Sequence, residues 1–168
     1  LSGGAVRLVG ASGLYVTEPV GGPADQPYYI NAILEVRTSL DPYALLVLCQ
    51  QVEAHHHRVR LVRWGPRTLD IDVITYDNLV SDDPALTLPH PRAHERAFVL
   101  VPWEQANPQA VIPSRDAATG EQTRHLVADL ARRVRAADER AGVNAVRFMR
   151  DMNLPKNLFD SGAESEGV

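Results

Sequence analysis

The chain has 168 residues, which suits one domain, and its formal net charge of −4 excludes a global positive field that would attract nucleic acid. No apolar run approaches the roughly 18 residues of a membrane span, and no signal peptide is recognisable. The lone cysteine, Cys49, excludes an internal disulfide and fits a reducing compartment. We therefore expect a cytoplasmic protein with one domain over residues 1–159 and a disordered polar tail over 160–168.

The first third of the chain predicts strands followed by a helix. Residues 5–17 are rich in β-branched and apolar residues interrupted by Gly10 and Gly13, so we expect a strand with a bulge or bend. Residues 19–27 hold three prolines and two glycines, which indicates a loop. Residues 28–38 alternate between polar and apolar side chains, which predicts a strand with Tyr29 and Asn31 on one face.

A helix is predicted from the pair Asp41-Pro42, a capping carboxylate followed by proline at the first helical position. The helix should reach about His56, with Gln50 and Glu53 on a more polar face. Its apolar face holds residues spaced by three and four positions, namely Leu45, Leu48, Cys49 and Val52. The three histidines that close it, His55 to His57, point about 100° apart, so we interpret them as a solvated helix end.

The rest of the chain alternates loops, strands and helices. Gly65-Pro66 breaks regular structure in the loop 58–67, and Asp77-Asn78 should form a turn. These segments suggest an α+β layered domain with an antiparallel or mixed sheet. The remaining elements that we expect are a strand over 68–76, a helix over 92–105, a short edge strand at 110–112, a helix over 123–135 and a short helix or strand over 144–152.

Asp70 and Asp72 are candidate ligands of a magnesium ion. Residues two apart on a strand face the same side, about 7 Å apart, and two such carboxylates resist burial unless a cation lies between them. Mg²⁺ takes one or two protein carboxylates and completes its shell with water and phosphate. The alternative is an ordinary solvent-exposed strand face, and spacing alone leaves both open.

Four arginines precede the carboxylates within ten residues, beside Trp64, and are candidate phosphate ligands: Arg58, Arg60, Arg63 and Arg67. A triphosphate with Mg²⁺ needs both signs of charge in one place, which favours phosphoryl transfer over a merely solvated basic loop. His90, before a predicted helix, and Arg96 are further anion-binding candidates. No glycine-rich phosphate loop is present, so side chains would have to hold the nucleotide.

These segments resemble one family, the 6-hydroxymethyl-7,8-dihydropterin pyrophosphokinases of folate biosynthesis. The resemblance covers roughly residues 7–108 in colinear order, and the tail beyond about Asn107 matches poorly. It rests on Arg58-Val59-Arg60, on Arg63-Trp64-Gly65-Pro66-Arg67-Thr68-Leu69-Asp70-Ile71-Asp72, on Leu88-Pro89-His90-Pro91 with Arg96-Ala97-Phe98-Val99-Leu100, and on Thr17, Gly22, Gln26-Pro27 and Tyr29-Ile30-Asn31.

The resemblance implies a ferredoxin-like α+β fold and transfer of diphosphate from ATP to the pterin hydroxymethyl group, with release of AMP. It implies that Asp70 and Asp72 hold two Mg²⁺ ions and that Arg58 and Arg67 assist transfer from a mobile loop. It implies an ATP site formed by Gln50, Glu53, Arg60, Trp64, His90 and Arg96. It implies a pterin pocket formed by Thr17, Tyr29, Asn31, Trp64 and Phe98.

The chain also departs from the family pattern. The family begins with a strand that ends in a G-S-N-type motif, and neither is found after Leu1; His57 stands where glycine is usual, and Leu61 replaces a commonly basic residue. Two alternatives therefore stay open: a non-catalytic pterin- or nucleotide-binding remnant, and a Mg²⁺-dependent phosphohydrolase. Expected partners are small molecules, with no nucleic acid and no membrane, and fusion to another folate-pathway enzyme is left open.

Overall fold

A computed structural model describes residues 5–17, 28–56, 69–116, 118–141 and 146–154. Its elements, in chain order, are β1 (Val6–Ala11), β2 (Leu14–Thr17), β3 (Tyr29–Asn31), β4 (Leu34–Thr38), α1 (Pro42–His55), a 3-10 turn (Ala93–Glu95), α2 (Ala97–Ala106), β5 (Val111–Arg115), β6 (Gln122–Leu126), α3 (Val127–Arg140) and β7 (Val146–Arg150). The predicted loops 19–27 and 58–67 and the predicted tail 160–168 lie outside the described residues.

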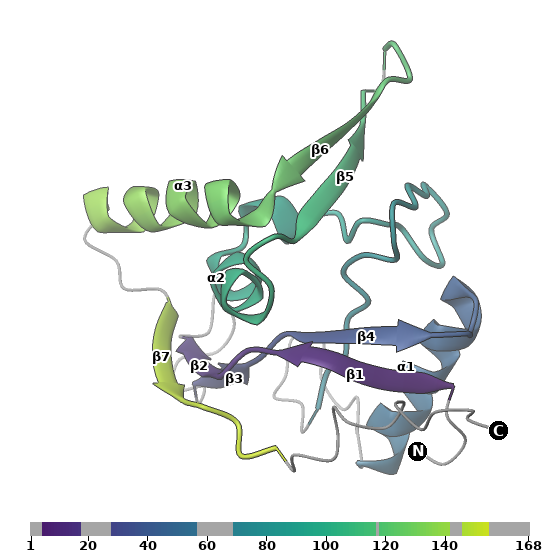
Figure 1. The fold of residues 1–168 in the computed structure, drawn as a ribbon, viewed down its shortest axis with the longest axis horizontal. Coiled ribbons are helices and arrows are strands. Elements are labelled where there is room, and N and C mark those ends of the chain that lie inside the picture. Colours follow the sequence, from purple (N-terminus) through teal and green to yellow (C-terminus); the bar gives the residue numbers. More distant parts are fainter. Residues whose placement is uncertain (1–4, 18–27, 57–68, 117, 142–145, 155–168) are drawn as a thin grey trace, which may run out of the picture.

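The strands form small antiparallel sheets that are packed together with helices, so the expected α+β layered fold is confirmed. β1 pairs with β4, β2 lies between β3 and β7, and β5 pairs with β6. Figure 1 shows α2 and α3 on the same side of the β1–β4 pair, and the β5–β6 hairpin projecting away from the body. None of the described helices is long and apolar enough to cross a membrane.

The first two strands show why the chain bends where it does. Residues 12 and 13 separate β1 from β2, and the ladder between β1 and β4 is irregular between Leu8 and Gly10, so the predicted bend and bulge are both found. The predicted strand over 28–38 is likewise divided, at residues 32 and 33. Ser12 occupies this break, because its backbone N–H donates to the carbonyl of Ile33 and its hydroxyl accepts from the Ile33 N–H, both at 2.9 Å.

Helix α1 follows its sequence signals closely. The Asp41 carboxylate accepts a hydrogen bond from the Ala44 N–H at 2.9 Å, and Pro42 occupies the first turn. The predicted apolar face is half-buried along its whole length. The predicted polar face is wrong at one position, since Gln50 is exposed but Glu53 is only 3% exposed.

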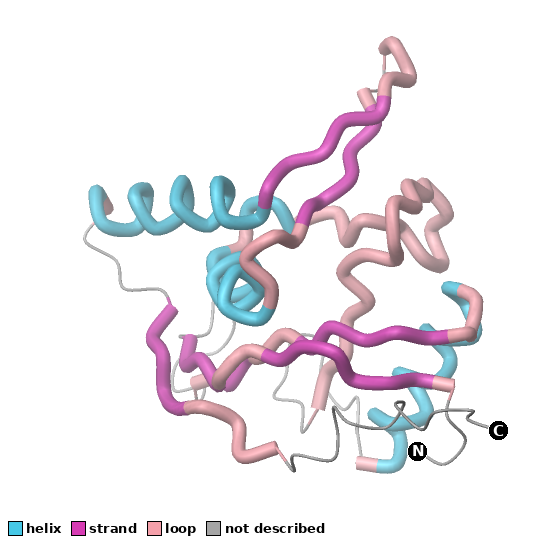
Figure 2. Tube along the Cα trace, in the orientation of Figure 1, coloured by secondary structure: helices cyan, strands magenta, loops and turns pink. Residues whose placement is uncertain are grey.

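Three predicted elements differ from the structure, and for the last of them the reason is a strand partner. Residues 69–76 form no ladder and are drawn as loop in Figure 2, so the predicted strand over 68–76 is wrong for the residues described. The predicted helix over 92–105 is interrupted at Arg96, whose backbone is extended. The predicted helix over 123–135 begins only at residue 127, because residues 122–126 pair with β5 instead.

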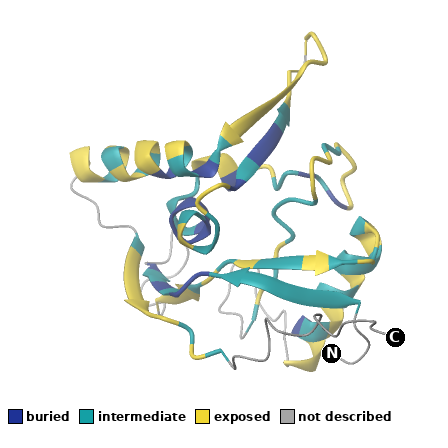
Figure 3. Ribbon diagram, viewed as in Figure 1, coloured by how far each residue is buried: buried dark blue, intermediate teal, exposed yellow. Residues whose placement is uncertain are grey.

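The core lies where α2 meets α3 and β5. Figure 3 shows buried residues concentrated along α2 and at the beginning of α3. Burial on this scale stabilises the fold chiefly by removing apolar surface from water. The buried cluster consists of Ala93, Val99, Leu100, Trp103, Ala110, Ile112, Val127 and Ala131, and Ile33, Ile74, Phe98, Leu130 and Val134 pack against it.

Candidate active site

The segment that carries Asp70 and Asp72 alternates in exposure. Asp70 and Asp72 are exposed, whereas Leu69, Ile71 and Val73 are half-buried. The period of two that the sequence predicted is therefore present, although the backbone lacks a strand partner. Both carboxylates face solvent, as ligands of a hydrated ion must.

Neighbouring elements hold this segment through its backbone and its last side chain. The Ile71 N–H donates to Oε1 of Glu53 on α1 at 2.8 Å, and the Ile74 carbonyl accepts from the His90 N–H at 2.8 Å. The hydroxyl of Tyr76 donates to the carbonyl of Leu40, just before α1, at 2.7 Å. These bonds take the place of ladder hydrogen bonds and fix both carboxylates relative to α1.

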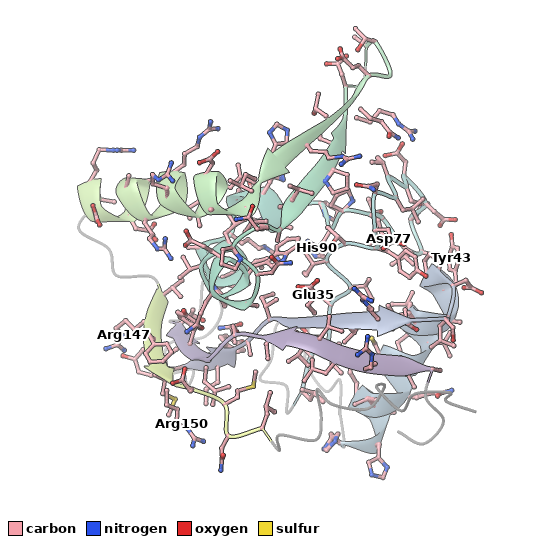
Figure 4. All side chains as sticks on the ribbon, viewed as in Figure 1. Glu35, Tyr43, Asp77, His90, Arg147 and Arg150 are labelled. Carbon is pink, nitrogen blue, oxygen red and sulfur yellow. The ribbon has the colours of Figure 1, made fainter. Side chains whose placement is uncertain are left out.

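His90 lies close enough to Asp72 and Arg96 for their charges to act on it. Partial burial lowers the pKa of His90 from its usual 6.5, the charge of Asp72 opposes that shift, and Arg96 reinforces it. The Nδ1 atom of His90 accepts from the Arg92 N–H at 3.3 Å. In Figure 4, His90 lies on the side of β4 where Glu35 is labelled. The structure thus brings three predicted site residues together.

Arg96 also connects this group to Phe98. Its guanidinium carbon lies 5.4 Å from the centre of the Phe98 ring, a distance that permits a cation–π interaction. Phe98 is half-buried at the start of α2 and packs against the core cluster. An aromatic ring anchored in this way can offer one face to a flat ligand.

The predicted pterin residues of β2 and β3 lie on one face of their sheet. Tyr15 is opposite Asn31 and Thr17 is opposite Tyr29, and directly opposed residues in an antiparallel pair share a face. The Asn31 amide donates to the Thr17 hydroxyl at 2.8 Å, which orients the amide. An oriented amide offers both a donor and an acceptor to a heterocycle.

The structure leaves several predicted site residues without a position. Arg58, Arg60, Trp64 and Arg67 lie outside the described residues, so their roles stay predictions. Gln50 is exposed on α1, one turn from Glu53. Glu53 is directed to the backbone of Ile71, which makes it a support of the carboxylate segment.

The two exposed carboxylates can be compared with the ligands that a metal ion requires. Within the described ranges, no three His, Cys, Asp or Glu side chains gather in a way that could enclose an ion. Two exposed carboxylates separated by one residue do fit Mg²⁺, which keeps several waters and shares its remaining positions with substrate phosphates. The donor set is therefore compatible with the predicted metal.

Sequence reasoning missed the role of Gln105 on α2. Its Oε1 atom accepts from the Gly13 N–H at 2.7 Å and from the Tyr15 hydroxyl at 3.1 Å. The side chain thereby holds the start of β2, which ends in Thr17. No local sequence pattern predicts a contact between residues about ninety positions apart.

Comparison with known proteins identifies relatives over most of the chain. The family model described as 7,8-dihydro-6-hydroxymethylpterin-pyrophosphokinase (HPPK) matches residues 1–108. The 2-amino-4-hydroxy-6-hydroxymethyldihydropteridine pyrophosphokinase of Haemophilus influenzae is 42% identical over 113 residues, which is 67% of this chain and 70% of that protein.

Two further relatives are larger proteins. The folic acid synthesis protein fol1 of Schizosaccharomyces pombe is 30% identical over 95% of this chain and 22% of its own length. The bifunctional protein FolKE of Lactococcus lactis is 41% identical over 58% of this chain and 30% of its own length.

Proposed function

This chain belongs to the 7,8-dihydro-6-hydroxymethylpterin-pyrophosphokinase family, and we propose that Asp70 and Asp72 hold its magnesium ions while Thr17, Tyr29, Asn31 and Phe98 bind the pterin. The reaction is the transfer of diphosphate from ATP to the hydroxymethyl group of 6-hydroxymethyl-7,8-dihydropterin, with release of AMP, in folate biosynthesis. ATP is the co-substrate.

The observation that carries the proposed roles is the exposure of both carboxylates on a segment whose alternate residues are half-buried. Such a segment presents two anionic groups in one direction from a fixed backbone. Magnesium held by Asp70 and Asp72 would neutralise the charge of the phosphate groups. We propose two ions, because two carboxylates that each ligate an ion can organise both sides of an in-line displacement.

The protein residues then supply binding and orientation. Asn31, oriented by Thr17, would hydrogen-bond the heterocycle, and the Phe98 ring would pack against its flat face. His90 and Arg96 would bind ATP near Asp72. Gln50, Arg60 and Trp64 complete the proposed ATP site, Glu53 supports it from α1 through the Ile71 N–H, and Trp64 also borders the pterin. Arg58 and Arg67 would neutralise charge that develops on the transferred group.

The proposal is tested by the formation of AMP in full-length protein supplied with Mg²⁺, ATP and hydroxymethyldihydropterin. The Asp70→Asn and Asp72→Asn variants keep the shape of the side chain but lose its charge, so we expect kcat/KM to fall by about 100-fold or more. Asp77→Asn is the matched control, because Asp77 is exposed on a turn with a φ of 46°, which asparagine tolerates.

Arg67→Ala separates transfer from binding. We expect it to lower kcat more than it weakens pterin binding, since an arginine that acts on the transferred group contributes mainly in the transition state. Equal losses of pterin affinity in the Asp70, Asp72 and Arg67 variants would contradict this division of roles. Phosphate release from ATP without a pterin acceptor would instead indicate a phosphohydrolase.

A further inference from the structure

Strand β7 lies beyond the part of the chain that the family model matches, which ends at residue 108, yet it pairs with a strand of the proposed pterin site. Val146 is opposite Thr17 and Phe148 is opposite Tyr15 in an antiparallel ladder. On its other edge, β2 pairs with β3, where Tyr29 is opposite Thr17. Thr17 therefore has a paired strand on each side, with Val146 of β7 opposite it on one edge and Tyr29 of β3 opposite it on the other.

The contact between β2 and β7 includes an aromatic pair. The Phe148 ring lies 5.5 Å from the Tyr15 ring, centre to centre, at an interplanar angle of 74°, which is the favoured edge-to-face arrangement. Tyr15 is 7% exposed and Phe148 is 52% exposed, so Phe148 covers one side of a buried ring. Tyr15 shares its sheet face with Asn31, the residue directly opposite.

Gly13 allows β7 to approach this closely. A Cβ atom at position 13 would lie 2.5 Å from Cε2 of Phe148 and 2.9 Å from the carbonyl oxygen of Arg150. Any side chain there would have to displace β7, including part of its backbone. The absence of a side chain at Gly13, just before β2, therefore leaves room for β7.

Arg147 makes a second contact that reaches past β2. Its guanidinium carbon lies 5.5 Å from the centre of the Tyr28 ring, immediately before β3. Adjacent residues of a strand point to opposite faces, so Phe148 contacts Tyr15 on one face of the sheet and Arg147 contacts Tyr28 on the other. In Figure 4, Arg147 and Arg150 extend from β7 at the edge of the molecule.

We propose that β7 is a positioning strand for pterin binding, in which Phe148, acting through Tyr15, fixes the backbone that places Thr17 and Asn31. The inference rests on the proposed function, because it assumes that Thr17 and Asn31 contact the pterin. In this proposal Phe148 acts through Tyr15 and not through a contact of its own with the substrate. Its loss should weaken pterin binding and leave ATP binding intact, because His90, Arg96 and the carboxylates belong to other elements.

The test compares Phe148→Ala with Met149→Ala in full-length protein. Met149 is the neighbouring residue on β7, is 51% exposed and lies at the irregularity of the ladder, between the residues opposite Leu14 and Tyr15, so it controls for the loss of an exposed apolar side chain. Calorimetry would measure the pterin dissociation constant with Mg²⁺ and a non-hydrolysable ATP analogue present. The dissociation constant of the analogue alone would be measured separately.

We expect Phe148→Ala to raise the pterin dissociation constant by about 3- to 10-fold, the size of effect typical of an aromatic pair. The affinity for the ATP analogue should stay within about twofold, and Met149→Ala should change neither constant. Phe148→Tyr keeps the ring and should bind pterin like the wild type. If Phe148→Ala does not fold, Phe148→Leu removes the edge-to-face contact with a smaller loss of volume and carries the same expectation.

Two outcomes would overturn the inference alone. One is an unchanged pterin affinity in a folded Phe148→Ala variant, with Thr17→Ala impaired as a positive control. The other is an equal loss of pterin and ATP affinity, which indicates general destabilisation and not positioning. A wild-type protein that binds the ATP analogue but no pterin would overturn the proposed function, and this inference with it.

Discussion

At the scale of single residues, the site depends on side chains whose surroundings decide their chemistry. Glu53 and Asp70 are both carboxylates of the proposed site, yet Glu53 is buried against a backbone N–H and Asp70 is exposed. A buried carboxylate that accepts a hydrogen bond is suited to support, whereas an exposed one can be reached by a hydrated cation. Their different roles therefore follow from burial.

Cys49 allows a residue-scale prediction on pH. Burial raises the pKa of its thiol above the ordinary 9.0, and the charge of Glu53 raises it further, against a smaller opposing effect of a backbone hydrogen bond. A raised pKa means less thiolate at a given pH, and the thiolate is the reactive form. We expect iodoacetamide at pH 8 to alkylate the folded protein about tenfold more slowly than the urea-unfolded chain. Equal rates in both states would contradict the shielding of this thiol.

At the scale of elements, the structure shows which predictions a local pattern can support. Helix α1 was predictable because Asp41, Pro42 and a repeat of apolar residues lie within one continuous segment. Capping gives this helix a measurable dependence on Asp41: Asp41→Ala should lower the free energy of unfolding by about 1 kcal/mol, whereas Asp41→Asn keeps an acceptor and should lower it much less. Urea denaturation followed by circular dichroism would measure both, and equal losses would argue against capping.

The elements that sequence did not predict depend on distant partners. The exposed Asp70 and Asp72 between half-buried neighbours fit the predicted alternation, but alternation could not reveal that Glu53 and His90 hydrogen-bond this backbone in place of a strand. Residues 123–126 were predicted as the first turn of a helix whose apolar repeat begins at Leu126, whereas they pair with β5 as a strand. A short helix or strand over 144–152 was expected and is found as β7, but its pairing with β2 and the contact of Gln105 with β2 could not be predicted, since both join residues about ninety or more positions apart.

At the scale of the whole molecule, one buried cluster joins α2, α3 and β5 and contacts residues in and next to the proposed site. Ile74 follows the carboxylate segment and Phe98 borders the proposed pterin pocket, and both pack against this cluster. An ion pair between Glu104 and Arg135, with oxygen and nitrogen 2.6 Å apart, also connects α2 to α3. The site is therefore positioned by the same packing that stabilises the fold.

Leu100 tests how far the molecule depends on that cluster. It is 0% exposed, so Leu100→Ala should lower the free energy of unfolding by about 2–5 kcal/mol through lost burial and the cavity that remains. Leu79→Ala deletes the same atoms from a side chain that is 39% exposed and should lower it by less than about 1 kcal/mol. Urea titrations followed by tryptophan fluorescence, to which the buried Trp103 contributes, would measure both variants. Similar losses in the two variants would show that this cluster does not dominate stability.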